Sequence, residues 1–151
     1  MTITPWHLKD YPLNKDDVLE TGEINGYIWV TAKAPFYGIN GYIRIPDAHT
    51  NHPWQEEGDY ICDQDSFDDD AECWEWGEET FHDGRWHGFG TQHFNDAWPA
   101  AYVWEGELPL ASKYPRDKWR TPESVVRQVQ QMARHADHTY QQLVTTGNYT
   151  I

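Results

Sequence analysis

Basic side chains are scarce in this sequence, and one long stretch lacks them completely. The chain carries 11 Lys and Arg residues against 25 Asp and Glu residues, for a formal net charge of −14. Between Glu56 and Asp83 there are thirteen acidic residues and no basic one. A surface of this sign repels nucleic acid and anionic membranes, and it attracts basic partners. We therefore expect no direct contact with nucleic acid and no membrane binding.

Long apolar runs and a basic leader are missing as well. No apolar run approaches the length that crosses a bilayer, and Met1–His7 lacks the basic and apolar regions of a secretory signal. The sequence thus predicts a cytoplasmic protein. In that compartment Cys62 and Cys73 would be reduced thiols.

Ligand spacing argues against a metal site. Structural zinc sites usually use two cysteines about two to four residues apart, whereas the two cysteines here are eleven apart. His49 and His52 fall in a loop and are better explained as hydrogen-bonded histidines. The run Asp63–Glu72 has the composition of a calcium loop, but Asp68 stands where that loop requires Gly. We predict no metal and no cofactor.

Aromatic residues dominate the apolar content, with nine Trp, nine Tyr and five Phe. We expect a core built largely from rings, with a few Trp left to face a partner. Two runs rich in β-branched and aromatic residues, Gly26–Thr31 and Gly41–Ile45, predict strands that are each bounded by an Asn-Gly pair. Further strands are expected at Glu72–Trp76, Arg85–Phe89 and Ala101–Trp104, with a hairpin turn at Asp83–Gly84.

One long helix is predicted over residues 121–146. Thr121 and Pro122 have the residue types of an N-cap and a first helical position, and Gly147 follows as a stop. Its apolar stripe is Val125, Val126, Val129, Met132, Ala133, Ala136, Tyr140, Leu143 and Val144.

The whole chain, residues 1–151, is expected to form a single α+β domain. A small, mostly antiparallel sheet with a long loop insertion packs against the C-terminal helix. Residues 1–22 form an irregular lead-in, and residues 46–70 form a long acidic loop.

Catalytic motifs are hard to find in this sequence. It has no Gly-x-Ser-x-Gly elbow and no phosphate-binding Gly loop. His93 and Asp96 are spaced as a general base and its orienting carboxylate, although such a pair is more often a local hydrogen bond. We predict no enzymatic activity, with this pair as the alternative.

Several short motifs resemble a family of small uncharacterised phage and prophage proteins. The family reads Asn-Gly-Tyr-Val-x-Val-Pro, His-Pro-x-Tyr-Gly, His-Gly-Gly-x-Thr and Gly-Phe-Asp-x-x-His-x-x-Asp, and ends in a helix. The similar stretches here are 25–30, 34–38, 76–81, 86–96 and 120–126. The resemblance implies phage origin for this chain.

The chain departs from that family in its polar residues. Trp76 and Glu78 replace a His and a Gly, and Gly90 replaces an Asp, so that this is a divergent acidic member. The departures imply that any ligand chemistry of the relatives is lost or changed here. What remains of the family's polar set is Thr80, His93 and Asp96.

The first functional hypothesis is an inhibitor of a bacterial defence system. Defence effectors hold nucleic acid in basic channels that grip its backbone. An acidic, aromatic-studded protein surface could occupy such a channel as a nucleic-acid mimic, like an anti-CRISPR protein. The partner-binding residues would be Asp63, Asp65, Asp68, Asp69, Asp70, Glu72, Trp74 and Glu75.

Two alternatives stay open at this point. The acidic face could serve solubility alone. The chain could also bind a small molecule, such as a nucleotide immune signal, in an aromatic pocket with basic residues. That pocket would be lined by Thr80, Arg85, Trp86, His93 and Asp96.

Overall fold

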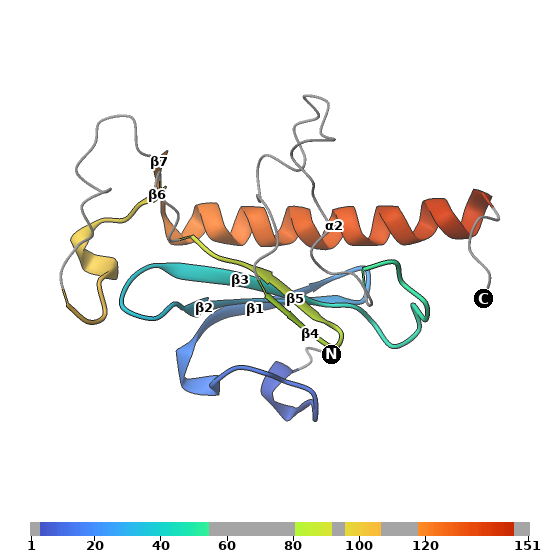
Figure 1. Cartoon of the computed structure of the whole chain (residues 1–151), viewed down its shortest axis with the longest axis horizontal. Helices are drawn as coiled ribbons and strands as arrows, with labels where there is room; N and C mark the ends of the chain where they lie inside the picture. Colours follow the sequence, from blue (N-terminus) through green and yellow to red (C-terminus); the bar gives the residue numbers. More distant parts are fainter. Residues whose placement is uncertain (1–3, 55–80, 92–95, 107–117, 147–151) are drawn as a thin grey trace.

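The computed structural model describes residues 4–54, 81–91, 96–106 and 118–146. A five-stranded antiparallel sheet carries one long helix on one of its faces (Figure 1). This arrangement confirms the α+β fold that the sequence predicts. In chain order the elements are η1 (Pro5–His7), η2 (Lys15–Asp17), β1 (Val18–Ile24), β2 (Tyr27–Lys33), β3 (Ile39–Arg44), β4 (Phe81–Asp83), β5 (Trp86–Phe89), β6 (Asp96–Ala97), η5 (Ala100–Tyr102), β7 (Lys118–Trp119) and α2 (Pro122–Thr146).

The strands of the sheet lie in the order β1-β2-β3-β5-β4, and every neighbouring pair is antiparallel. Asn25 and Gly26 connect β1 to β2 with positive φ angles of 52° and 89°. Two positive φ angles define the type I′ turn, which Asn-Gly favours in hairpins. The predicted hairpin is confirmed as the connection from β4 to β5, although its loop is Gly84 and Arg85, and Asp83 is the last residue of β4. β6 and β7 form a separate parallel pair.

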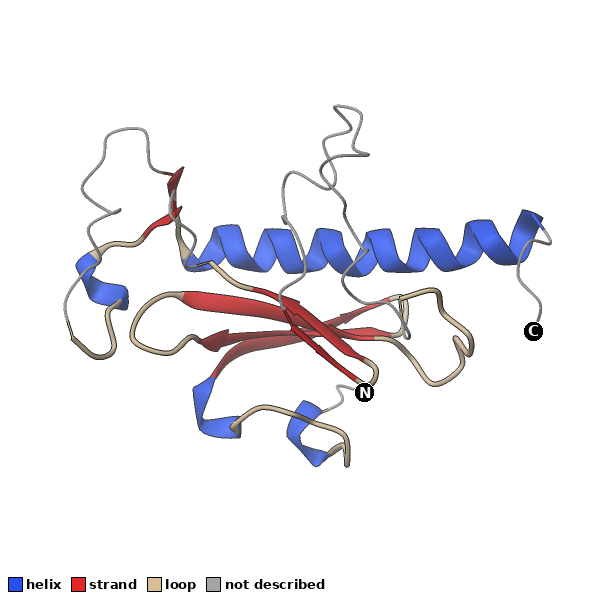
Figure 2. Ribbon diagram, in the orientation of Figure 1, coloured by secondary structure: helices blue, strands red, loops and turns tan. Residues whose placement is uncertain are grey.

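Both faces of the sheet are covered, so β2 is buried along nearly its whole length. Tyr27 and Trp29 belong to the core cluster that includes the apolar stripe of α2, whereas Ile28 and Val30 belong to a second cluster. Successive side chains of a strand point to opposite faces, which explains this alternation. Figure 2 shows the helix on one side of the sheet and the N-terminal segment on the other.

The N-terminal segment is therefore a layer of the fold. Leu8 and Tyr11 pack against the second cluster, on the face away from α2. Arg44 Nε donates to both carboxylate oxygens of Asp10, at 3.1 and 3.0 Å, and so ties this layer to β3. The charged group thereby stays at the rim while the apolar side chains of the segment cover the sheet.

The prediction that residues 1–22 are irregular is wrong for the last five of them. β1 begins at Val18 and pairs with β2 as far as the turn. The strand carries Glu, Thr and Gly in succession, residues that bury little and give a weak strand pattern. It forms because it pairs with β2, whose residues are apolar and buried along nearly the whole strand.

Two further local predictions differ from the structure. Asn40 and Gly41, expected to bound a strand, lie inside β3 because that glycine accommodates a ring from β5. Of the strand expected at Ala101–Trp104, the first two residues belong to the 3-10 helix η5, closed by a bond from Tyr102 N to Pro99 O at 3.0 Å, and Val103 forms an isolated antiparallel bridge with Tyr37. Proline favours the start of such a helical turn.

The predicted helix is confirmed. Thr121 Oγ1 accepts from Ser124 N at 3.0 Å, and Ser124 Oγ accepts from Thr121 N at 3.1 Å, which makes a reciprocal cap. The predicted stripe is buried from Val125 to Tyr140 except for the partly buried Val126, whereas Val144 is 37% exposed. The predicted stop at Gly147 lies outside the described residues.

Three glycines of the sheet each lie beneath an aromatic ring from the neighbouring strand. Gly22 is opposite Trp29, Gly41 is opposite Phe89, and a third glycine, at position 88, is opposite Tyr42. A Cβ at Gly22 would lie 2.6 Å from the indole, and a Cβ at Gly41 would lie 2.6 Å from Phe89 Cζ. These distances are far inside van der Waals contact, so the rings occupy the space that any other residue would fill.

We expect Gly41→Ala to lower the free energy of unfolding by about 1–3 kcal/mol, because the new methyl group overpacks the core. The methyl would meet Phe89 Cζ at 2.6 Å and Val129 Cβ at 3.1 Å. Urea unfolding of both single variants and of Gly41→Ala with Phe89→Leu measures the coupling. The double variant should recover part of the loss because leucine lacks the ring atom. Strict additivity would show that the ring contact is not the cause.

Candidate functional site

The negative charge of the chain is concentrated in residues 55–80, called here the acidic segment. It contains 12 of the 25 acidic residues and no Lys or Arg. The described residues hold eleven acidic and nine basic residues, so their charges nearly balance. The segment itself lies outside the described residues, but its two flanking residues, Trp54 and Phe81, are part of the fold.

Most of the predicted site residues belong to segments outside the described residues. Asp96 opens β6, which pairs with β7. The described geometry therefore does not test whether the acidic residues form one partner-binding surface. It also does not test whether His93 lies beside Asp96. The predicted residues outside the described ranges are Asp63, Asp65, Asp68, Asp69, Asp70, Glu72, Trp74, Glu75, Thr80 and His93.

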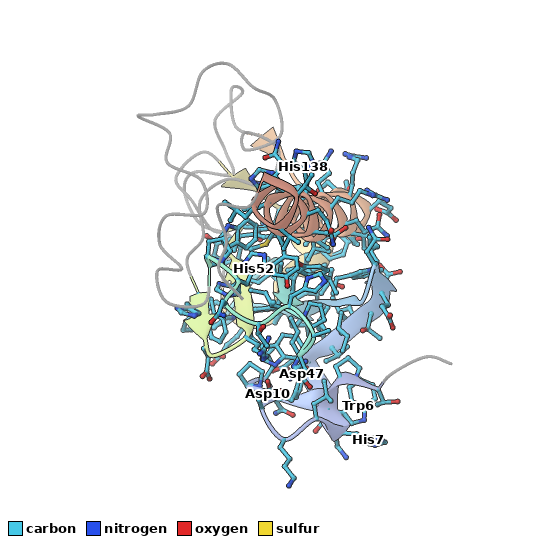
Figure 3. The ribbon with its side chains drawn as sticks, turned by 90° about the vertical axis from the view of Figure 1, so that its right-hand side faces the viewer. Trp6, His7, Asp10, Asp47, His52 and His138 are labelled. Carbon is cyan, nitrogen blue, oxygen red and sulfur yellow. The ribbon has the colours of Figure 1, made fainter. Side chains whose placement is uncertain are left out.

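The two remaining residues of the predicted ligand pocket are engaged within the fold. Trp86 is fully buried in the second core cluster, and its Nε1 donates to Asp10 Oδ1 at 3.2 Å. Arg85 Nη1 donates to Pro46 O at 2.8 Å, and its Nε lies 3.3 Å from Asp47 Oδ1. Trp86 thus offers no surface to a ligand, and Arg85 is already paired. In Figure 3 Asp10 and Asp47 lie close together at the edge of this network.

The start of the acidic segment is fixed by buried side chains. Residues 46–54 form no helix or strand, as predicted for the long loop, yet His52 and Trp54 are only 2% and 6% exposed. His52 Nε2 donates to Ala136 O at 2.9 Å, and its Nδ1 accepts from Trp54 N at 3.1 Å. This part of the loop is held against α2, which Figure 3 shows beside the labelled His52.

A stack of rings extends from this point along the helix. Tyr140 of α2 is parallel to His49 at 4.0 Å between ring centroids, and His52 is parallel to the same ring at 5.8 Å. His49 Nδ1 lies 2.8 Å from Tyr27 Oη. The loop, the helix and β2 are therefore joined by one set of aromatic contacts.

The end of the acidic segment joins the same region. Phe81 begins β4 and meets Tyr42 edge to face at 5.2 Å, while His82 stacks on His87 of β5 at 4.4 Å. The Trp54 ring lies 6.1 Å from the His87 ring. Trp54, before the acidic segment, and His82, after it, therefore both lie beside His87. We call His49, His52, Trp54, His82, His87 and Tyr140 the histidine–aromatic cluster.

Burial disfavours the charged form of three histidines of this cluster, His49, His52 and His87. Desolvation lowers the pKa of His52 to about 4 and that of His87 to about 3, and it also lowers the pKa of His49. The contacts of His52 agree with neutrality. A carbonyl can only accept and an amide N–H can only donate, so Nε2 carries the proton and Nδ1 is bare. A second proton would face the Trp54 N–H.

The described residues also line a pocket of about 530 Å³ along α2. Its lining is Asn25, Gln131, Arg134, His135 and His138. These side chains offer amide and imidazole groups and one guanidinium, which suit a polar or anionic ligand. Figure 3 places His138 on the helix away from His52.

His49 and His52 are hydrogen-bonded histidines, as predicted. Both rings also stack on Tyr140, which their spacing in the sequence does not indicate. Among the described residues, no group of three or more His, Cys, Asp or Glu side chains is placed to hold a metal ion. Sequence reasoning missed the cluster because its members are up to 91 positions apart. The one local signal of burial is the large apolar ring of Trp54, which follows His49, His52 and Pro53 closely in the sequence.

Comparison of the chain with protein-family models, curated proteins and solved structures finds no match. The resemblance to small phage proteins therefore stays a prediction. Within the ranges that the structure describes, no helix combines the length and apolar character needed to cross a membrane.

Acid should destabilise the fold through His52. Its pKa is about 6.5 when unfolded and about 4 when folded, so the unfolded chain binds more protons below pH 6.5. This group's contribution is complete above pH 6.5 and falls by about 3 kcal/mol on acidification to pH 4.

Urea unfolding between pH 7.5 and 4 measures this loss. His52→Gln should flatten the pH dependence, whereas His7→Gln, at an exposed position, should leave it unchanged. Equal pH slopes for wild type and His52→Gln would contradict the assignment.

Proposed function

We propose that this chain is a phage-encoded anti-defence protein, comparable in action to an anti-CRISPR inhibitor. It binds a basic nucleic-acid-binding effector of the host through the acidic segment, as a nucleic-acid mimic, in the cytoplasm of the infected bacterium. The residues that meet the basic partner are Asp63, Asp65, Asp68, Asp69, Asp70, Glu72 and Glu75, with Trp74 as an apolar anchor.

The observation that carries the proposal is the separation of charge. Twelve acidic residues without a base lie in one segment, while the described residues are close to neutral. If negative charge served solubility alone, it would be expected over the whole surface. Concentration in one segment instead creates a local field that steers a basic partner to one place.

Channels that hold nucleic acid are suited to such a ligand. They bind the phosphate backbone with Lys and Arg, mostly without reading sequence. Carboxylates can make the same charge-assisted hydrogen bonds, often bidentate with Arg. A protein that presents many carboxylates together therefore competes for the same side chains as nucleic acid.

The anchoring of the segment supports this use. Trp54 at one end and His82 near the other both contact His87. The chain thus leaves the described fold and re-enters it beside the same buried ring, His87. A binding element with fixed ends loses less conformational freedom on association than a free tail does.

The small-molecule alternative has less support from the described residues. Of its predicted lining, Trp86 is fully buried and Arg85 is paired with Asp47. The pocket along α2 involves other residues and has a single guanidinium, from Arg134. A chain of net charge −14 would also repel an anionic nucleotide.

Two triple variants test the proposal. Each removes three negative charges, one variant from the acidic segment and the other from the described fold. Asp68→Asn, Asp69→Asn and Asp70→Asn together change the acidic segment. The matched control changes Asp83→Asn, Glu105→Gln and Glu123→Gln, which are exposed positions on the described fold. Both triple variants raise the net charge by the same amount.

Each form is used to capture proteins from lysates of bacteria that carry defence systems, and the captured effector is assayed for loss of nucleic acid. Wild type and the control should capture a nucleic-acid-binding effector and displace its DNA or RNA. The Asp68–Asp70 variant should bind it at least about tenfold more weakly, with reduced salt dependence. Equal binding by all three forms, or equal weakening by both variants, would refute the proposal.

A further inference from the structure

We propose that the free edge of β1 is a second binding surface, which takes an extended basic segment of a partner protein by strand addition. This surface is separate from the acidic segment and does not depend on the proposed function. The inference rests on the register of the first hairpin, the exposure of β1 and the charges along it.

The register shows which backbone groups face outward. In a two-residue hairpin the residues that flank the turn form a hydrogen-bonded pair, and such pairs alternate along the ladder. Ile24 faces Tyr27 across the Asn25–Gly26 turn. Ile24 and Gly22 therefore direct their N–H and C=O groups toward β2. Thr21 and Glu23 direct theirs away from the sheet.

This outward edge has no strand beside it in the described part of the chain. β1 is the first strand in the sheet order, and no described segment makes a backbone hydrogen bond to Thr21 or Glu23. In Figure 3 β1 lies at the border of the molecule. β4, at the opposite border of the sheet, has three residues, whereas β1 has seven. Seven residues are long enough to accept an added strand.

The charges along β1 define the chemistry of the strand that would pair with it. Glu20 and Glu23 are exposed on the strand, and Asp16 and Asp17 precede it directly. Lys15 is the one basic residue between positions 15 and 24. Cross-strand pairs of opposite charge stabilise a sheet, so a segment with Lys or Arg at alternate positions can pair with either Glu20 or Glu23, which point to opposite faces of the sheet. Leu19, 41% exposed, offers an apolar contact at the end of the edge.

A second copy of this chain is a poor occupant of the same edge. Two β1 strands paired antiparallel would bring Glu20 and Glu23 of one copy near those of the other. Like charges across strands are destabilising. Natural edge strands often carry charges against such self-pairing. Here the charges are all negative, so the groups that prevent self-pairing favour a basic strand.

Hydrogen exchange tests whether the edge is open. Amide protons of Gly22 and Ile24 should exchange slowly because they bond to β2, whereas those of Thr21 and Glu23 should exchange fast in the free protein. NMR of the labelled full-length chain resolves each amide. If Thr21 and Glu23 are as protected as their neighbours, the edge is covered and the proposal fails.

Binding is tested with two ten-residue peptides of equal charge, one of alternating Lys and Val and one of the same sequence with every backbone nitrogen methylated. Only the first can supply a ladder of N–H groups, because methylation removes the donor on both edges of the strand. It should bind wild type and protect the Thr21 and Glu23 amides, and the methylated peptide should do neither. Equal binding of both peptides, or protection elsewhere only, would show simple charge attraction and overturn the proposal.

Two variants at position 23 distinguish the contribution of the backbone N–H from that of the carboxylate. Glu23→Pro and Glu23→Ala both remove the carboxylate, but only the proline removes the outward N–H, and proline is tolerated at a sheet edge. Binding of the Lys-Val peptide to Glu23→Pro should be roughly three- to tenfold weaker than to Glu23→Ala. Equal affinities would contradict strand addition.

The Asp68–Asp70 variant tests whether this surface is independent of the proposed function. The Lys-Val peptide should still protect the Thr21 and Glu23 amides in this variant. Loss of that protection would place the peptide on the acidic segment instead. Sedimentation of wild type should give a monomer. Self-association abolished by Glu23→Pro would assign the edge to a second copy and overturn the inference.

Discussion

The fold depends on aromatic rings that lie directly over glycines of neighbouring strands. Trp29 covers Gly22 and Phe89 covers Gly41. Eight of the twenty buried apolar residues in the described part of the chain are aromatic, and these large rings need flat places to lie on. The glycines also fix the register, because a shift by one residue would put a side chain where a ring now lies. The sheet that carries every other feature is held in alignment by these pairs.

Neutral polar side chains and acidic side chains occupy different places relative to this sheet. The histidine–aromatic cluster joins the loop after β3, the start of β4 and the helix, and burial keeps His52 and His87 neutral. Burial thus disfavours a charge on these two histidines, whereas acidic residues are concentrated in the sequence between Trp54 and Phe81. Neutral buried rings and the strongly acidic segment are therefore adjacent along the chain.

The sequence predicts local features well and long-range ones poorly. The turn at Asn25–Gly26 and the helix from Thr121 follow from residues within a few positions, and both are found. β1 was missed because Thr-Gly-Glu has little propensity for strands, and it is the partner strand that makes it one. Stacking of His52 on Tyr140 could not be foreseen either, since it joins residues 88 positions apart. For the candidate site, the acidic composition can be predicted from the sequence, but the ring contacts at the two ends of the acidic segment cannot.

The shared anchoring of Trp54 and His82 on His87 has a consequence for how this protein can evolve. Where two chain ends lie side by side, the sequence between them can lengthen, shorten or change composition at small cost to the fold. Selection can therefore act on residues 55–80 almost independently of the ring-built sheet. Relatives that meet different host proteins would be expected to keep the rings and glycines while exchanging the charged sequence between the two anchors.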